Sequence, residues 1–506
     1  MKQRKRFFLI FILSILFSAT ALGVVLYSFG WRFDWDSKRI VKTGIFYFKV
    51  EPKSAKVYID GKFIKKTDIF FGSALISNLL PKKYKVEIKK EGYYPWTKEL
   101  KIKEREATEA KSITLIPKKI SFSLLDKNIE KIFFSPDGEK ILFKEFKISE
   151  EKKNNKNNDK VKKDWTLKLF DIKKNLKIEL AEKKDFLFYP KKIKQREKKT
   201  QFNLDSVIFS KKAKKAVLKI KTEKEVRYFL LNLEENFKKP ILLDFLKNEN
   251  IKDIYFNPVN NEKLFISVKE SAVKSKTSKK EKENTQGSEE LVLKEVDLKD
   301  KKITPTGIKN IISFSVDKNK IFYLSTDGFL YEKDMFSQKN KKITLVPIPV
   351  DKNTSCTINS LNSEFILNCQ EGIYLVEEKG TFRKIKEENY SVVFSSDLKK
   401  AGIFDKHNIF ILFLKEKYSQ PQRKKGELVF LTRFNEEIKN LYWYNGNYLI
   451  FSVGKEIKIA EIDNRDHLNI YNLGEFKNPK IFWSQKENIL FVLSENLLYS
   501  SGKLLP

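Results

Sequence analysis

The residues whose chemistry could support catalysis or metal binding are few and scattered. The chain holds two histidines, His407 and His467, and two cysteines. These numbers are too small for a four-cysteine zinc site or a disulfide-dense scaffold, so we expect no metal centre and no cofactor. The sequence also lacks a Gly-x-Ser-x-Gly elbow, a His-Glu-x-x-His helix and a phosphate-binding loop. We therefore assign no catalytic residue.

The two cysteines have a spacing that fits one structural bond. Cys356 and Cys369 flank an expected hairpin. With a two-residue turn at residues 362–363, Leu361 lies opposite Glu364, and counting outward places Cys356 opposite Cys369. This register predicts a disulfide if the chain is exported. Two alternatives stay open: a register shifted by one residue, and two buried free thiols.

An aromatic cluster is the second candidate site. Tyr93, Tyr94 and Trp96 lie close together and follow a glycine. They could form a platform on which a sugar ring stacks. The alternative is that these rings cover an apolar core, because aromatic side chains bury large areas.

Composition and charge limit the possible partners. The chain has 506 residues, 13% aromatic residues and a formal net charge of +35. The length predicts two or three domains, and the aromatic content favours β-structure. The charge fits a polyanionic partner, although lysines that simply solvate the surface would give the same number. The lysines are spread along the chain and concentrate in expected loops, so we expect no nucleic acid partner.

The N-terminus predicts a membrane-spanning segment. A basic tail, residues 1–6, precedes an apolar run from Phe7 to Phe29. This run is long enough to cross a bilayer as a helix, and the basic tail should remain in the cytoplasm. Tyr27, Trp31 and Trp35 would then lie at the outer interface, and residues 30–43 would form a juxtamembrane linker. A cleaved signal peptide is the alternative, because residues 19–21 read Ala-Thr-Ala.

Residues 44–117 predict a small antiparallel β-sandwich of about six short strands. Phe46, Phe48 and Val50 alternate with other residues, as do Tyr84, Val86 and Ile88. The run from Val50 to Gly61 resembles the opening of a PEGA domain, although the name-giving Pro-Glu-Gly-Ala is Pro-Lys-Ser-Ala here. The later run around Gly92-Tyr93-Tyr94-Pro95-Trp96 resembles that family's second half. The resemblance implies a cell-surface or envelope domain without catalytic residues.

Residues 118–506 contain one recurring hairpin. Its clearest copy reads Phe134-Ser135-Pro136-Asp137-Gly138, a tight turn between two apolar strands. We count eight copies, with the first strands near residues 132–135, 207–210, 254–257, 312–315, 358–360, 392–395, 441–443 and 481–484. A repeat of roughly 40–50 residues with three or four strands is typical of a β-propeller. The region resembles TolB-type, WD-repeat-like propellers. We expect eight blades, with seven as the alternative, and a strand near residues 120–125 that completes the last blade.

These features together predict an all-β protein: an N-terminal transmembrane helix, a small antiparallel β-sandwich and a seven- or eight-bladed β-propeller. Three Lys-rich inserts, at residues 150–163, 191–200 and 270–290, are expected to be disordered. We expect a membrane-anchored, extracytoplasmic cell-envelope protein with a non-catalytic binding or scaffolding role. The expected partner is an envelope protein, an anionic wall polymer or a glycan. The alternative is a propeller enzyme that acts on envelope glycans or peptides.

Overall fold

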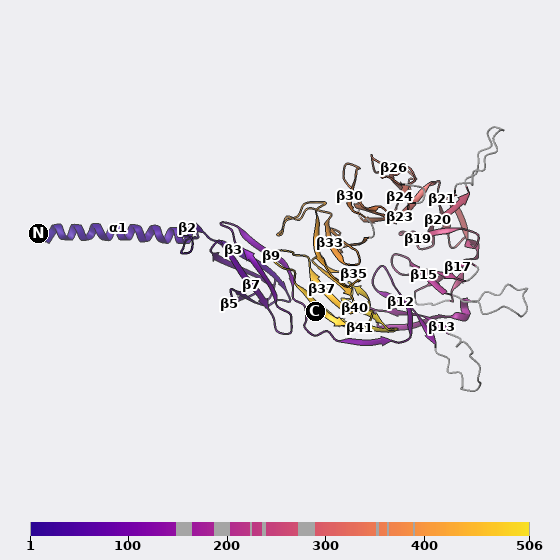
Figure 1. The fold of residues 1–506 in the computed structure, drawn as a ribbon, viewed down its shortest axis with the longest axis horizontal. Helices are drawn as coiled ribbons and strands as arrows, with labels where there is room; N and C mark the ends of the chain where they lie inside the picture. Colours follow the sequence, from indigo (N-terminus) through magenta and orange to yellow (C-terminus); the bar gives the residue numbers. More distant parts are fainter. Residues whose placement is uncertain are drawn as a thin grey trace, which may run out of the picture.

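The chain begins with one long apolar helix and continues as β-structure. The computed structural model describes residues 2–147, 164–186, 203–222, 225–234, 239–271, 289–350, 354–361, 364–387 and 390–504. Helix α1 (Lys2–Ser28) contains a segment, Arg6–Ser28, that is long and apolar enough to cross a membrane. It ends just before Gly30, whose positive φ of 80° breaks the helical path. Figure 1 shows α1 projecting away from the β-structure.

The segment expected to be a linker is folded. Strands β1 (Trp31–Asp34) and β2 (Arg39–Lys42) form an antiparallel hairpin within residues 30–43. The Asp34 carboxylate stabilises its turn by accepting hydrogen bonds from the backbone N–H of Asp36 (3.2 Å) and the hydroxyl of Ser37 (2.7 Å). The juxtamembrane linker predicted at residues 30–43 therefore contains a β-hairpin, which the Asp-x-x-Ser turn signal indicates.

Residues 44–117 form two packed sheets. One sheet has the order β5 (Lys62–Lys66), β4 (Lys56–Ile59), β7 (Lys83–Lys89) and β8 (Trp96–Lys101). The other has the order β6 (Ser73–Leu79), β3 (Gly44–Glu51) and β9 (Ala107–Thr114). The β3–β9 pair is parallel, so the prediction of a purely antiparallel sandwich was wrong. Strands β3 and β9 are the first and last strands of the sandwich, so no tight turn connects them. A parallel pair is therefore possible, because the intervening strands provide the long connection that it needs.

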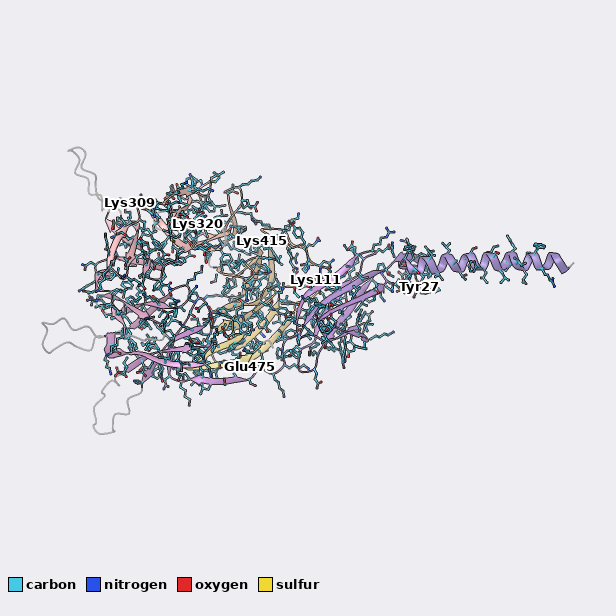
Figure 2. All side chains as sticks on the ribbon, turned by 180° about the vertical axis from the view of Figure 1, so that it is seen from behind. Tyr27, Lys111, Lys309, Lys320, Lys415 and Glu475 are labelled. Carbon is cyan, nitrogen blue, oxygen red and sulfur yellow. A yellow bond between two sulfur atoms is a disulfide. The ribbon has the colours of Figure 1, made fainter. Side chains whose placement is uncertain are left out.

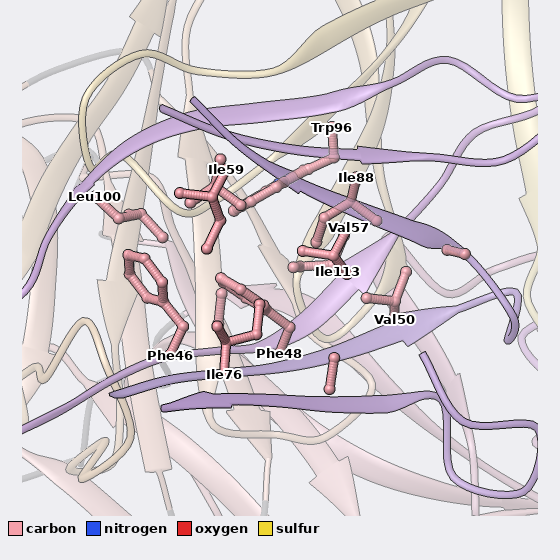
Figure 3. Close-up of a cluster of buried hydrophobic side chains, with 14 of the residues drawn as sticks. Phe46, Phe48, Val50, Val57, Ile59, Ile76, Ile88, Trp96, Leu100 and Ile113 are labelled. Carbon is pink, nitrogen blue, oxygen red and sulfur yellow. The ribbon is translucent and has the colours of Figure 1, made fainter. Parts of the chain in front are cut away.

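The core of this sandwich follows the alternation seen in the sequence. Phe46, Phe48 and Val50 on β3 are fully buried, and they face Val86 and Ile88 on β7. Figure 3 shows Phe46, Phe48, Val50 and Ile88 between the two sheets. Burying each large side chain contributes about 1.5–3 kcal/mol, so the strand pattern is a strong determinant of this fold.

Eight four-stranded antiparallel sheets follow within the described residues, and we name them blades 1 to 8. Blade 1 contains β11 (Ile129–Phe134), β12 (Lys140–Lys147), β13 (Asp164–Asp171) and β14 (Leu176–Glu182). Blade 2 contains β15 (Asn203–Phe209), β16 (Lys215–Lys221), β17 (Val226–Asn232) and β18 (Ile241–Leu242). Blade 3 contains β19 (Ile251–Phe256), β20 (Lys263–Ser271), β21 (Glu289–Asp297) and β22 (Lys302–Pro305). Blade 4 contains β23 (Ile311–Asp317), β24 (Lys320–Ser325), β25 (Leu330–Asp334) and β26 (Asn340–Lys342).

The remaining blades repeat the same order, and the last one draws on both ends of the propeller. Blade 5 contains β27 (Cys356–Leu361), β28 (Glu364–Cys369), β29 (Gly372–Val376) and β30 (Phe382–Lys386). Blade 6 contains β31 (Ser391–Phe394), β32 (Lys400–Phe404), β33 (Asn408–Phe413) and β34 (Leu428–Arg433). Blade 7 contains β35 (Ile438–Asn445), β36 (Tyr448–Val453), β37 (Glu456–Glu461) and β38 (Ile470–Glu475). Blade 8 contains β39 (Lys480–Ser484), β40 (Ile489–Ser494), β41 (Leu497–Lys503) and, as its outer strand, β10 (Phe122–Asp126). The prediction of a completing strand near residues 120–125 is therefore confirmed.

The blades close into a ring through apolar packing. Phe491 and Leu498 of blade 8 pack against Ile141 and Phe143 of blade 1. Each of the other seven neighbouring pairs of blades shares its own buried cluster. An open row of sheets would leave two apolar faces in water, so closure buries the surface that a single blade cannot.

The recurring turn has a defined chemistry. The Ser135 hydroxyl donates to Asp137 (2.6 Å) and accepts from the N–H of Lys140 (2.9 Å), while Gly138 has a φ of 71°. The Lys140 ammonium then reaches the next blade and donates to the carbonyls of Ala213 and Leu233, each at 2.9 Å. The turn therefore closes one hairpin and also ties two blades together.

The predicted inserts fall mainly outside the described residues. Residues 150–163 and 191–200 are not part of the described chain. The prediction of a disordered insert at 270–290 is wrong at both of its ends, because β20 extends to Ser271 and β21 begins at Glu289. Ser271 pairs with Glu289 in the ladder, so these ends are strand.

Candidate ligand-binding groove and domain junction

A groove of about 400 Å³ lies between blades 3 and 4. It is formed by the turn between β19 and β20, the outer strands of blade 3 and the turn after β25. Its lining residues are Asn257, Val259, Asn260, Lys263, Phe265, Glu295, Thr304, Pro305, Thr306, Ile321, Lys333, Met335, Phe336 and Gln338. The turns involved join first to second and third to fourth strands, and we call the face of the ring that carries such turns the proximal face.

The proximal face is directed toward the helix end of the molecule. In Figure 2, Lys320, at the start of β24 and on the proximal side of blade 4, lies nearer to Tyr27 than Lys309 does. Lys309 belongs to the connection between blades 3 and 4, which lies on the opposite, distal side. A ligand in the groove would therefore face the same side as the sandwich.

The groove has an apolar floor and an aromatic rim. Phe265 and Ile321 form the floor, and both belong to the cluster buried between blades 3 and 4. At the rim, the Phe336 side chain is 73% exposed. Its turn is fixed by Asp334, which accepts hydrogen bonds from the N–H groups of Phe336 (3.0 Å) and Ser337 (2.8 Å). A flat aromatic ring is therefore presented to the solvent on a defined turn.

The polar walls carry more positive than negative charge. The Lys263 ammonium lies 3.2 Å from the Glu295 carboxylate, so these two charges offset each other. The Lys333 ammonium donates to the Thr306 carbonyl at 2.6 Å, its one acceptor in the described part of the chain. An ammonium group has three donors, so Lys333 retains capacity to bind a carboxylate or phosphate.

The groove offers a ligand one available cation and one exposed aromatic ring. Glu295 is the only carboxylate among the lining residues, and it is paired with Lys263. Glycoside hydrolysis commonly uses two carboxylates that flank the scissile bond. An aromatic rim beside an available cation suits an anionic sugar polymer or an acidic peptide.

The aromatic cluster predicted as a sugar platform lies instead at a junction between the sandwich and blade 7. Trp96 is 1% exposed and its Nε1 donates to Glu461 at 2.8 Å. Tyr94 stacks on Tyr471 of β38 with ring centroids 4.9 Å apart, and Tyr93 packs against the sandwich core. The platform interpretation is therefore wrong for Trp96, because its ring is buried. The sequence indicated that these rings could be buried. It did not indicate that blade 7 of the propeller covers them.

A buried ion pair lies at the centre of this junction. The Lys98 ammonium, with no exposed side-chain surface, is 2.8 Å from Glu461 Oε1. It also donates to the carbonyls of Asp463 (2.8 Å), Arg465 (2.9 Å) and His467. Burial raises the pKa of Glu461 even with Lys98 beside it. Every donor of the ammonium therefore has a partner, as a buried charge requires.

Further contacts extend the junction to blade 6. Gln420, between β33 and β34, donates to the Ala107 carbonyl (2.9 Å) and accepts from the Glu109 N–H (3.1 Å). Tyr448 of β36 accepts from the Thr114 N–H at 3.0 Å. Near this loop, burial lowers the pKa of Lys417 to about 8. The sandwich thus bonds to two blades on the proximal face.

The cysteine pair lies where the hairpin register placed it. Cys356 on β27 is opposite Cys369 on β28, and the structure joins their Sγ atoms in a disulfide. The expected turn at residues 362–363 lies outside the described residues, although Leu361 and Glu364 pair on either side of it. The bond lies within blade 5, so its role is structural.

The groove and the ion pair were missed in the sequence. One signal was available: a lysine opens the second strand of blades 1, 2, 3, 4 and 6, at Lys140, Lys215, Lys263, Lys320 and Lys400. Aligning the repeats on this lysine would have drawn attention to Lys263. No comparable signal marks Lys98, because lysine is abundant and its burial depends on a partner hundreds of residues away.

Comparisons with known proteins agree with this architecture. Residues 44–117 match the family model of the PEGA domain, so the sandwich is a PEGA domain. No curated protein sequence matches the chain.

Three solved structures resemble the chain at the level of the fold. The β-propeller domain of Myceliophteria thermophila Cps50 (Swd1) is 10% identical with a TM-score of 0.39, covering 76% of this chain and 99% of that one. A eukaryotic initiation factor is 12% identical with a TM-score of 0.42, covering 76% and 87%. A prolyl endopeptidase is 10% identical with a TM-score of 0.41, covering 73% of this chain and 55% of that one. These likenesses concern the fold alone.

Proposed function

We propose that this chain is a membrane-anchored, extracytoplasmic envelope protein whose propeller binds an anionic ligand without catalysis. Helix α1 acts as the retained anchor, with its basic N-terminus in the cytoplasm. Its C-terminal turn contacts the folded part: Arg32 donates to the Tyr27 carbonyl at 2.6 Å, and its guanidinium lies 3.3 Å from the centre of the Tyr27 ring. The apolar helix continues past residues 19–21 to Ser28, and this continuation supports a retained helix.

The observation that carries the proposal is the buried Lys98–Glu461 junction. It bonds the PEGA domain to the propeller through charges that are costly to separate. The helix, the PEGA domain and the propeller therefore form one continuous body. The PEGA domain serves as a spacer that holds the propeller at a fixed orientation to the membrane, as a scaffold or receptor requires.

The groove between blades 3 and 4 is the proposed ligand site. Its available cation, Lys333, and its exposed ring, Phe336, fit an acidic wall polymer or an acidic segment of an envelope protein. The net charge of +35 adds a long-range attraction for such partners.

The test compares binding by the full chain, reconstituted in lipid nanodiscs, to a purified teichoic-acid-type polymer and to poly-glutamate. Lys333→Gln removes the available cation, and Phe336→Ala removes the ring. We expect Lys333→Gln to weaken binding by roughly tenfold or more, because one charged hydrogen bond contributes about 1.5–3 kcal/mol. We expect Phe336→Ala to weaken binding as well, because the stacking surface is lost. Lys309→Gln, which removes one charge on the distal side, is the matched control and should bind like the original chain. Equal weakening by Lys309→Gln would show that net charge, and not the groove, binds the polymer.

A further inference from the structure

The hairpin directly after α1 exposes apolar side chains that the rest of the protein does not cover. Phe33, Trp35 and Ile40 are 45%, 81% and 61% exposed. The register places Phe33 opposite Ile40, and it places Trp31 opposite Lys42. Residues directly opposite on antiparallel strands share a face, so the apolar side chains and Lys42 lie on one side of the hairpin.

This hairpin has a fixed orientation. Arg32 connects it to the helix through Tyr27 and to β6 through Asn78, whose Oδ1 accepts a hydrogen bond at 3.3 Å. At its base, the Thr43 N–H donates to the Gly30 carbonyl at 2.9 Å. Figure 1 shows β2 at the end of α1, between the helix and the PEGA sheets. The exposed apolar face is therefore presented by a structured element.

The same hairpin is rich in cations. Lys38 and Arg39 are exposed at its turn, and Lys42 Nζ lies 5.9 Å from the centre of the Trp31 ring. Arg105 of the PEGA domain lies 5.7 Å from the same ring. Of the nearby acids, Asp34 is engaged by its own turn, where it accepts hydrogen bonds from Ser37 and Asp36. A surface that combines aromatic rings with cationic side chains suits the boundary between lipid and water.

We propose that the β1–β2 hairpin lies in the headgroup layer of the outer leaflet and binds anionic phospholipid headgroups through Lys38, Arg39 and Lys42. The inference rests on the proposed retention of α1. A helical span of 23 residues measures about 34 Å at 1.5 Å per residue. The hydrocarbon core is about 30 Å thick, so the residues that follow Ser28 lie at headgroup depth. The phosphates there are partners for cations, and the interface is the preferred depth of tryptophan.

This contact would set the tilt of the whole protein. The hairpin is bonded to the helix and to the PEGA domain, and the PEGA domain is bonded to blades 6 and 7. A hairpin held flat in the headgroup layer would therefore hold the proximal face, and the groove on it, at a constant angle to the membrane.

The tryptophans provide a direct test. Trp96, Trp165, Trp443 and Trp483 are at most 4% exposed, so quenching by brominated lipid chains reports on Trp31 and Trp35. The full chain is reconstituted in brominated phosphatidylcholine vesicles with and without phosphatidylglycerol. We expect quenching in both vesicles, with more in those that contain phosphatidylglycerol. Trp35→Phe should remove most of the quenched emission.

Charge variants test the role of the headgroups. Lys38→Gln with Arg39→Gln should abolish the extra quenching caused by phosphatidylglycerol. Lys62→Gln with Lys66→Gln, an equal loss of charge on exposed strand β5, should leave that quenching unchanged.

Two outcomes would overturn the inference. One leaves the retained anchor intact, and the other rules it out as well. If the chain stays in the vesicles after an alkaline wash but Trp35 is not quenched in either lipid, the hairpin inference fails and the anchor stands. If the alkaline wash releases the chain, the retained anchor fails and the hairpin inference fails with it.

Discussion

Replacing Lys98 by methionine tests how the PEGA domain is held on the propeller. Met has a similar length but no charge, so Glu461 is left buried without its cation. Glu461 would keep its hydrogen bonds from Trp96 Nε1 (2.8 Å) and from the side chain of Asn469 (2.7 Å). The change therefore isolates the ion pair from the rest of the junction.

The expected cost is about 3 kcal/mol at neutral pH, the lower end of the 3–5 kcal/mol seen when one partner of a buried pair is removed. We expect the lower value because Glu461 keeps its hydrogen bonds from Trp96 and Asn469. Burial raises the pKa of Glu461, and without Lys98 this pKa rises further. The folded variant then binds a proton more readily than the unfolded chain does. Its stability therefore increases as the pH falls below that raised pKa toward the unfolded value, and in this range its deficit relative to the original chain shrinks by up to about 1.4 kcal/mol per pH unit.

The assay is denaturant unfolding of the full chain followed by tryptophan emission, to which the buried Trp96 of the PEGA domain contributes. Adding Glu461→Gln to Lys98→Met should restore most of the lost stability, because no buried charge remains and the amide oxygen still accepts hydrogen bonds. Lys83→Met is the matched control: its partner Glu99 is 2.7 Å away but both side chains are exposed, so the loss should be below about 1 kcal/mol. A loss from Lys98→Met as small as that from Lys83→Met would show that the buried ion pair does not hold the PEGA domain on the propeller.

Two further predictions concern single sites. Thiol titration of the denatured, non-reduced protein should find no free thiol, and Cys356→Ser with Cys369→Ser should lower stability by about 2–4 kcal/mol; two free thiols would contradict the disulfide between these residues. Burial lowers the pKa of Lys417 to about 8, so between pH 8 and its unfolded value the folded state binds fewer protons and stability rises with pH. Lys417→Met should remove this rise in a comparison of denaturation midpoints, and parallel pH profiles for the two proteins would contradict the assignment.

The parts predicted from the sequence are those set by local patterns. The alternation of Phe46, Phe48 and Val50 defined a half-buried strand, and the Ser-Pro-Asp-Gly turn defined a hairpin, because both signals lie within a few residues. Repetition of that hairpin gave the propeller. The completing strand β10 could be predicted because the last repeat lacked an outer strand.

The parts that were missed depend on contacts between distant segments. Trp96 and Lys98 belong to the same strand of the PEGA domain, but their partner Glu461 lies in blade 7. The alternating pattern of a strand does not identify which of its lysines becomes buried at a domain junction. The groove has the same origin, because Lys263 and Lys333 come from different blades and line one groove only when blades 3 and 4 pack together.

The most direct test of the account is the position of the propeller relative to the membrane. Intact cells, and then cells stripped of their outer layers, are treated with protease and probed for the propeller and for the N-terminal helix. If the propeller is extracytoplasmic, it is digested before the cytoplasmic membrane is lysed, while a fragment that contains residues 6–28 stays in the membrane. A propeller that survives until lysis would contradict the proposed orientation. A released propeller that lacks residues 1–21 would contradict the retained anchor.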